Sequence, residues 1–269
     1  MTLPKIPYYH IDSLLNSGGM ANVYLGLDLR SGFPVAVKEL FSNRTKDKFI
    51  IQNFRVEASL YCHLSHPNLT KLVDFVEYGD KCYLIMEFVD GKSLDVLLNT
   101  ENKPLEEKKL VPVFCQILEA VAYIHQKRIL HLDLKPGNIM LKDDGKIKIL
   151  DMGNSARIDD NNLKNRPKIG SPAFMAPEQI NQKELGFYSD IFALGVTFFN
   201  MLTGKLPFSG AGHTDIFEKI CNEKTPLAKD FYPDVNPEFQ KIINRALQKD
   251  GSKRYQTCEE FQMELLEVS

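Results

Sequence analysis

The sequence predicts a bilobal α+β fold with a small β-rich N-terminal lobe and a larger, mainly helical C-terminal lobe. Up to Met86, turn residues separate short runs in which apolar and polar residues alternate, a pattern typical of strands. After Gly91 the apolar residues recur at helical spacing. The length of 269 residues is near the upper size of one hydrophobic core, which favours one large domain or two lobes.

Two hairpins and a helix are predicted in the N-terminal lobe. The first hairpin joins the alternating residues 23–28 to the apolar run 33–40 through the turn at residues 30–32. The second joins residues 72–78 to residues 81–86 through Gly79-Asp80, a pair suited to a tight turn. Between the hairpins, residues 49–64 place apolar side chains at helical spacing.

The C-terminal lobe is predicted to be helical with one small hairpin. Residues 104–126 form an amphipathic pattern, with Pro112 either near the first turns of the helix or at a kink. Residues 138–141 and 146–150 flank the turn Asp143-Asp144-Gly145 and predict a hairpin. From Pro177 onward we expect helices joined by loops, ending in an amphipathic helix at residues 258–268.

Composition excludes several classes of protein. The formal net charge of -2 argues against a dedicated nucleic-acid or membrane-surface binder, because such proteins concentrate Lys and Arg. Five cysteines without a C-x-x-C pair argue against a disulfide framework and a zinc ribbon. The longest apolar run, Ile191 to Leu202, is about half of the roughly 20 residues that span a bilayer. We therefore expect a cytoplasmic protein without a membrane segment, and the sequence indicates no oligomeric state.

Polar residues concentrate between Leu130 and Gly153, in turns beside short strands. Asp133, Asn138 and Asp151 offer the oxygen ligands that Mg²⁺ prefers, and a lysine supplies a point charge to phosphate. A single Asp or Asn in a turn usually caps the local backbone. The grouping favours a magnesium and phosphate site.

Four motifs in this order resemble those of the protein kinase family. They are Val-Ala-Val-Lys38, His-Leu-Asp133-Leu-Lys-Pro-Gly-Asn138, Asp151-Met-Gly153 and Ala-Pro-Glu178. The resemblance extends from about Tyr8 to the C-terminus. It implies a single Hanks-type kinase domain over residues 1–269, with an N-lobe at 1–86, a hinge at 87–91, a C-lobe at 92–269 and ATP bound between the lobes. The implied reaction transfers the γ-phosphate of Mg-ATP to Ser or Thr hydroxyls of a protein substrate.

The resemblance implies a role for each polar residue of these motifs. Lys38 would bind the α and β phosphates of ATP, and Glu57 on the predicted helix would pair with its ammonium. An unpaired ammonium in an apolar strand is costly to bury, which supports the pairing; otherwise Lys38 reaches solvent and Glu57 is a surface charge. The other implied roles are orientation of the attacking hydroxyl by Asp133, support of the transferring phosphoryl group by Lys135, and ligation of Mg²⁺ by Asn138 and Asp151.

Apolar residues match the nucleotide pocket of the family, although each of them taken alone is more often a packed core residue. The glycine loop of the family falls on residues 16–23 and keeps only the middle glycine of the pattern, Gly18. The added Gly19 beside it makes the loop resemble that of bacterial members. The loss of the other two glycines concerns the affinity of the chain for nucleotide. The implied nucleotide-binding residues, besides Lys38, are Leu15, Gly18, Gly19, Val23, Ala36, Met86, Glu87, Val89 and Met140.

Two further features concern regulation and substrate class. Leu132 stands where the family often has Arg, and residues 154–170 contain Ser155 but no Thr or Tyr. We hypothesise that activity does not depend on phosphorylation of that segment. The residues at positions 135 and 171, Lys and Ser, resemble those of serine/threonine kinases rather than those of tyrosine kinases. Ser171 would then hydrogen-bond Asp133 and Lys135; the alternative is that it only forms a Ser-Pro turn.

Two other functions are compatible with this fold. One is a pseudokinase that binds nucleotide as a scaffold, and the other is a small-molecule phosphotransferase. The sequence favours the enzyme over the scaffold, because it retains the full set of Lys38, Glu57, Asp133, Asn138 and Asp151. The Ala-Pro-Glu motif weighs against the small-molecule enzyme.

Overall fold

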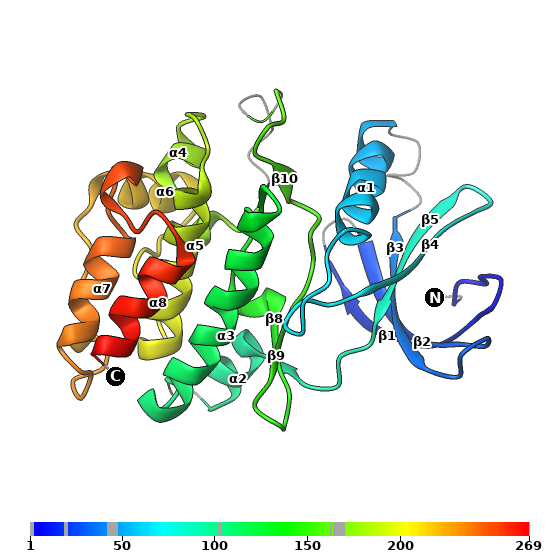
Figure 1. Ribbon diagram of the computed structural model, residues 1–269, viewed down its shortest axis with the longest axis horizontal. Helices are drawn as coiled ribbons and strands as arrows, with labels where there is room; N and C mark the ends of the chain where they lie inside the picture. Colours follow the sequence, from blue (N-terminus) through cyan, green and yellow to red (C-terminus); the bar gives the residue numbers. More distant parts are fainter. Residues whose placement is uncertain are drawn as a thin grey trace. The chain divides into compact units, whose positions relative to one another are not determined.

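The computed structural model describes residues 3–18, 21–41, 48–101, 104–161, 163 and 170–268. It confirms the α+β class, because a β-sheet forms from the N-terminal part of the chain and helices dominate the C-terminal part (Figure 1). The chain divides into two compact units, Met1–Asp90 and Gly91–Ser269.

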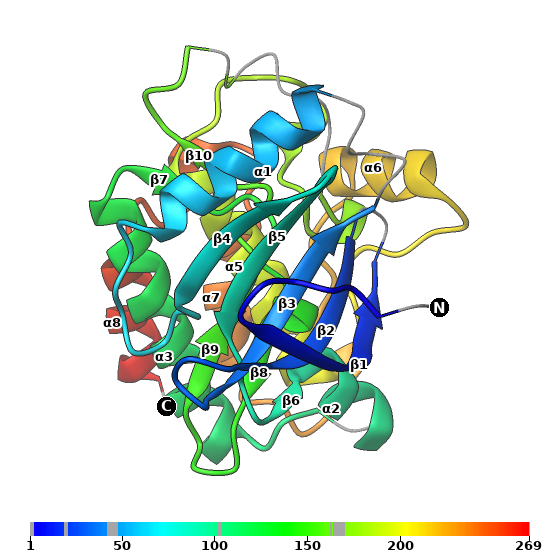
Figure 2. The same cartoon turned by 90° about the vertical axis from the view of Figure 1, so that its right-hand side faces the viewer.

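The N-terminal unit is a five-stranded antiparallel sheet with the strand order β1-β2-β3-β5-β4 (Figure 2). Both predicted hairpins are present, and the predicted helix ends at Tyr61. Most of strand β1 is exposed, so the sequence shows no alternation that would predict it. The elements are β1 (Tyr9–Ser17), β2 (Ala21–Asp28), β3 (Pro34–Leu40), α1 (Lys48–Tyr61), β4 (Leu72–Tyr78) and β5 (Lys81–Glu87).

One face of this sheet carries the core of the unit. Residues at alternate positions of the strands pack on it, as the two-residue period of a strand requires. The buried side chains of this cluster are Ile6, Tyr9, Ile11, Tyr24, Val35, Val37, Tyr83 and Ile85.

The C-terminal unit is built around the buried helix α5 (Phe187–Thr203), which includes the long apolar run from Ile191 to Leu202. The unit also contains α2 (Leu94–Glu101), α3 (Glu107–Gln126), α4 (Pro177–Ile180), α6 (His213–Asn222), α7 (Glu238–Ala246) and α8 (Cys258–Glu267). Its short strands are β6 (Lys92–Ser93), β7 (Ile129–Leu130), β8 (Ile139–Leu141), β9 (Ile147–Ile149) and β10 (Ala156–Arg157).

Aromatic rings join the helices of this unit. The ring of Phe198 on α5 lies 4.8 Å from that of Phe114 on α3 and 6.4 Å from that of Phe261 on α8. Pro112 lies in the second turn of α3, which agrees with the predicted position near the first turns of the helix. Within the described ranges, no helix is long and apolar enough to cross a membrane.

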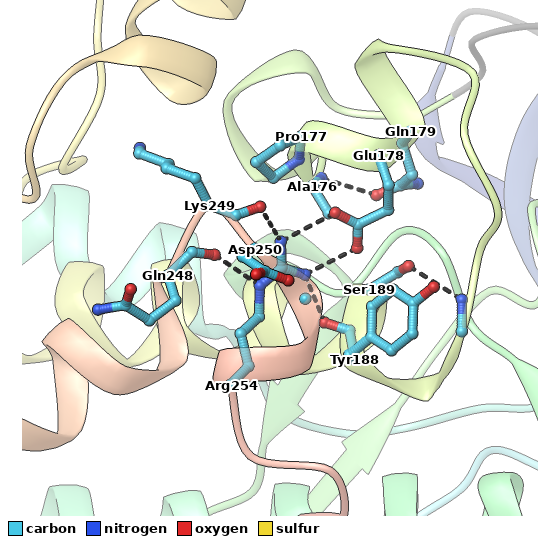
Figure 3. A network of polar contacts seen from close by, with 12 residues as sticks. Ala176, Pro177, Glu178, Gln179, Tyr188, Ser189, Gln248, Lys249, Asp250 and Arg254 are labelled. Atoms are coloured by element: carbon cyan, nitrogen blue, oxygen red, sulfur yellow. Dashed lines mark hydrogen bonds and ion pairs between the residues drawn. The ribbon is translucent and has the colours of Figure 1, made fainter.

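A buried ion pair joins α4 to the segment before α8 (Figure 3). The Arg254 guanidinium donates to both carboxylate oxygens of Glu178, at 2.7 and 2.8 Å, and to the carbonyl oxygens of Tyr188 and Gln248. A bidentate pair with its remaining donors satisfied holds a buried guanidinium without an unpaired charge. The ion pair between Glu178 and Arg254 therefore has a structural role.

Candidate active site

Lys38 and Glu57 meet inside the N-terminal unit. The Lys38 Nζ lies 2.8 Å from the Glu57 Oε1, and the Lys38 and Glu57 side chains are 17% and 3% exposed. Strand β3 carries the lysine and α1 carries the glutamate, and the ring of Phe54 lies 5.8 Å from the same Nζ. A buried ammonium in this apolar setting requires a partner, and the carboxylate supplies one.

The strand register places the predicted pocket residues on one face of the sheet. Val23 pairs with Lys38, and Ala36 pairs with Met86. Cross-strand partners share a face, and so do residues two apart on a strand. Val23, Ala36, Lys38 and Met86 therefore line the face opposite the core cluster.

The other predicted pocket residues of this unit lie at its edges. Leu15 is exposed, at a shift in the register between β1 and β2. The Gly18 amide donates to the Ala21 carbonyl oxygen at 2.9 Å, while Gly19 lies outside the described residues. Glu87 ends β5 and Val89 is buried just after it.

The carboxylate of Asp133 is held by three donors. Its Oδ1 accepts from the Ser171 amide at 3.0 Å, and its Oδ2 accepts from the Lys135 Nζ and the Asn138 Nδ2, both at 3.1 Å. The Lys135 Nζ also donates to the Ser171 Oγ at 2.5 Å. Both hydrogen bonds predicted for Ser171 are present, and Ser171 also precedes the short turn Pro172–Phe174. The side chain of Asp133 is thus fixed in one orientation.

The backbone before Asp133 is held by the side chain of Asp190, in the first turn of α5. Its buried carboxylate accepts from the amides of His131 and Leu132 and contacts the His125 Nε2, each at 2.8 Å. Burial alone would raise the pKa of Asp190, but these hydrogen bonds and the histidines outweigh it and lower the pKa. The ionised carboxylate holds Leu132 at φ +63°, a conformation that leucine adopts at a cost.

Asn138 and Asp151 are brought together by the β8–β9 hairpin. The amide of Leu150, the residue before Asp151, donates to the Asn138 carbonyl oxygen at 2.8 Å. The Asp151 Oδ1 accepts from the Gly153 amide at 3.0 Å, and the Asn138 Nδ2 also donates to the Asp133 carbonyl oxygen at 2.9 Å. These contacts orient one carboxylate and one amide oxygen. Met140 lies partly exposed on β8, opposite Lys148.

The oxygen donors of Asn138 and Asp151 fit a magnesium ion. Mg²⁺ usually takes one or two protein oxygens and completes its shell with water and phosphate. No group of three His, Cys, Asp or Glu side chains suited to a metal occurs in the part of the chain that the structure describes. A magnesium site of this kind does not need such a group.

A pocket of about 490 Å³ opens beside Lys135 within the C-terminal unit. Pro136 and Gly137, which follow Lys135, form one wall, while Phe174 and Phe231 contribute aromatic rings. Asp95 at the start of α2 adds a carboxylate. The pocket is large enough for a side chain of a bound peptide.

Comparison with known proteins decides the family. The profile of the protein kinase domain matches residues 9–266. The chain belongs to the protein kinase family.

Three bacterial proteins illustrate what this kinase chain is similar to. It is 36% identical over 258 residues to the serine/threonine-protein kinase PrkC of Bacillus subtilis, covering 96% of this chain and 40% of PrkC. It is 34% identical over 255 residues to the probable serine/threonine-protein kinase PknB of Lactococcus lactis, covering 94% of this chain and 40% of that protein. With PknB of Mycobacterium tuberculosis the identity is 30% over 267 residues, covering 97% of this chain and 42% of PknB. The chain spans about 40% of the length of the first two relatives, and its family implies a nucleotide substrate and protein substrates.

The segment after Asp151 in this kinase is anchored by apolar packing. Leu163 is buried in one cluster with Leu130, Leu132 and Ala156. The side chain of Ser155 is buried too, with its Oγ donating to the His131 carbonyl oxygen at 3.3 Å. The only hydroxyl residue between 154 and 170 is therefore enclosed. Sequence reasoning missed this anchor because a single leucine in a polar segment carries no periodicity.

Proposed function

We propose that the chain is a Mg-ATP-dependent serine/threonine protein kinase that transfers the γ-phosphate to Ser or Thr hydroxyls of protein substrates. The observation that carries this proposal is the Asp133 carboxylate, which Ser171, Lys135 and Asn138 hold in place. Phosphoryl transfer needs positioning and charge neutralisation more than covalent chemistry. A fixed carboxylate beside an ammonium meets both needs.

Nucleotide binding is assigned to the sheet face that carries Lys38. Its ammonium, oriented by Glu57, binds the α and β phosphates. The adenine is enclosed by the apolar residues Leu15, Val23, Ala36, Met86 and Met140, and its edge is bonded by the backbone of Glu87 to Val89. In this proposal residues 1–86 form the N-lobe, 87–91 the hinge and 92–269 the C-lobe.

Magnesium binding is assigned to Asn138 and Asp151. When bound, Mg²⁺ neutralises charge on the phosphate oxygens. The hairpin contact at Leu150 supports this assignment, because it keeps the two residues together beside the paired ends of β8 and β9.

Asp133 and Lys135 are assigned to the reacting groups. The carboxylate of Asp133 orients the substrate hydroxyl and accepts its proton, while the hydroxyl oxygen bonds to the γ-phosphorus and the bond to the ADP oxygen breaks. The ammonium of Lys135 stabilises charge on the transferring group. The pocket beside Lys135 receives the protein substrate.

We further propose that the domain resides in the cytoplasm. All five cysteines are free, and Cys82, Cys115 and Cys258 are buried, which suits a reducing compartment. Fractionation of cells that produce the protein tests this assignment, and recovery outside the cytoplasm would contradict it.

The activity is tested by transfer of labelled γ-phosphate from Mg-ATP to casein, followed by phosphoamino-acid analysis. We expect phosphoserine or phosphothreonine with the wild type and a loss of about 100-fold or more with Asp133→Asn and Lys38→Met. Asp12→Asn, a change at an exposed carboxylate of β1, is the matched control. Nucleotide binding without transfer under varied metals and substrates would favour the pseudokinase instead.

A further inference from the structure

A row of polar residues crosses the N-terminal sheet beside the glycine loop. Ser17 pairs with Asn22, Asn22 with Glu39, and Glu39 with Tyr83, so the row runs over β1, β2, β3 and β5. Each member is adjacent in sequence to a residue of the opposite face, such as Val23 or Lys38. The row therefore lies on the face that packs the core.

Hydrogen bonds link three residues of this row, Ser17, Asn22 and Glu39, with their neighbours Tyr24 and Lys81 in one network. The Ser17 Oγ donates to the Asn22 Oδ1 at 2.8 Å, and the Asn22 Nδ2 donates to the Tyr24 hydroxyl at 3.0 Å. The Tyr24 hydroxyl donates to the Glu39 Oε2 at 2.9 Å, and the Lys81 Nζ donates to the Glu39 Oε1 at 2.6 Å. The chain of contacts runs without a break from β1 to β5.

Burial makes the loss of any of these hydrogen bonds costly. Asn22 and Glu39 are each 6% exposed and Tyr24 is 3% exposed. A buried polar group that loses its partner is strongly disfavoured, so each side chain restricts the next to one geometry. Burial and the hydrogen bond to Glu39 raise the pKa of Tyr24, so its hydroxyl stays protonated and donates at neutral pH.

The network ends at the glycine loop. Ser17 and Asn22 flank it, and the Gly18 amide donates to the Ala21 carbonyl oxygen at 2.9 Å directly inside that pair. The loop has only one of the three glycines of the family pattern, so its close approach to phosphate relies on an accurately placed backbone. The hydrogen-bonded row supplies a fixed base for it.

We propose that Asn22, Tyr24 and Glu39 are positioning residues that hold the two ends of the glycine loop in the conformation that binds the phosphates of ATP. This inference rests on the proposed function. A loop held in its bound conformation loses less freedom when the nucleotide binds, and this strengthens binding. The network touches no nucleotide itself, because it lies on the opposite face of the sheet from Lys38.

The same sheet offers a matched control at a different site. The Tyr9 hydroxyl donates to the Asp74 Oδ2 at 2.8 Å, and Tyr9 is 5% exposed. Tyr9 lies at the start of β1, opposite Asp28, while Ser17 ends that strand. Tyr9→Phe and Tyr24→Phe each delete one hydroxyl that bonds a carboxylate, but only Tyr24 belongs to the hydrogen-bonded network at the glycine loop.

The test compares the Kd for Mg-ATP, the KM and kcat for phosphate transfer, and the melting temperature. We expect Tyr24→Phe to raise the Kd and the KM for ATP about 5-fold, the factor of one typical hydrogen bond, with kcat within about 2-fold. Asn22→Leu, which breaks two links of the row, is expected to raise them at least as much. Tyr9→Phe is expected to lower the melting temperature and leave the Kd within about 2-fold of wild type.

Two results would overturn the proposal. One is a Kd for Tyr24→Phe within 2-fold of wild type, and the other is an equal rise with Tyr9→Phe, which would show a general effect of sheet stability. A second readout is hydrogen exchange of the Gly18 amide without nucleotide, whose protection is expected to fall about 5-fold in Tyr24→Phe and to stay unchanged in Tyr9→Phe. This readout decides the inference even when the wild type transfers no phosphate, the result that contradicts the proposed function alone.

Discussion

Among the described side chains, two ion pairs connect helix α1 to the sheet, and they differ chiefly in burial. The Lys38–Glu57 pair spans 2.8 Å between side chains that are 17% and 3% exposed. The Arg55–Glu77 pair spans 2.7 Å between side chains that are 51% and 42% exposed. Glu57→Gln and Glu77→Gln therefore make the same chemical change in two environments.

The expected losses of stability follow from that difference. Removing one partner of a buried pair costs about 3–5 kcal/mol, and we take about 3 kcal/mol for Glu57→Gln because Lys38 is partly exposed. An exposed pair contributes about 1 kcal/mol at most, which sets the limit for Glu77→Gln. These figures correspond to drops in melting temperature of roughly 6–12 °C and under about 4 °C.

Scanning calorimetry measures both drops, and phosphate transfer adds a second comparison. Glu57→Gln is expected to raise the KM for ATP because the ammonium of Lys38 is no longer oriented by a carboxylate, whereas Glu77→Gln is expected to leave the KM unchanged. Equal losses of stability in the two variants, or an unchanged KM in Glu57→Gln, would refute the reasoning.

Two further predictions concern protonation and phosphorylation. Burial lowers the pKa of Lys249 to about 8 from the 10.5 of a free lysine, so between these values the unfolded chain binds more protons and stability rises with pH. Urea unfolding from pH 7 to 10 should show this rise in the wild type relative to Lys249→Met, and a flat difference would contradict it. Phosphatase treatment should leave transfer activity unchanged, because Ser155 is enclosed. Loss of activity together with removal of a phosphate mapped to residues 154–170 by mass spectrometry would contradict that expectation.

Local chemistry made much of the fold and site predictable. The hairpins were predicted because Gly79-Asp80 and Asp143-Gly145 form turns whose preferences depend on few neighbours. Lys38 and Asp133 stood out because each lies in a short motif with fixed spacing. Strand β1 did not, since only Tyr9 and Ile11 at its start are buried and the rest of this edge strand is exposed, which imposes no alternation.

The sequence by itself determined the fold class, the family resemblance and the polar residues that carry the chemistry. Only the tertiary structure decided which distant residues support them. These are Asp190, which accepts from the amide of Leu132, Leu163 in its apolar cluster, and the hydrogen-bonded network from Ser17 to Lys81. The row depends on the pairing of four strands, and a shift of one residue would turn its side chains to the other face. Periodicity and turn chemistry report the preferences of a segment, whereas register and packing arise only when segments meet.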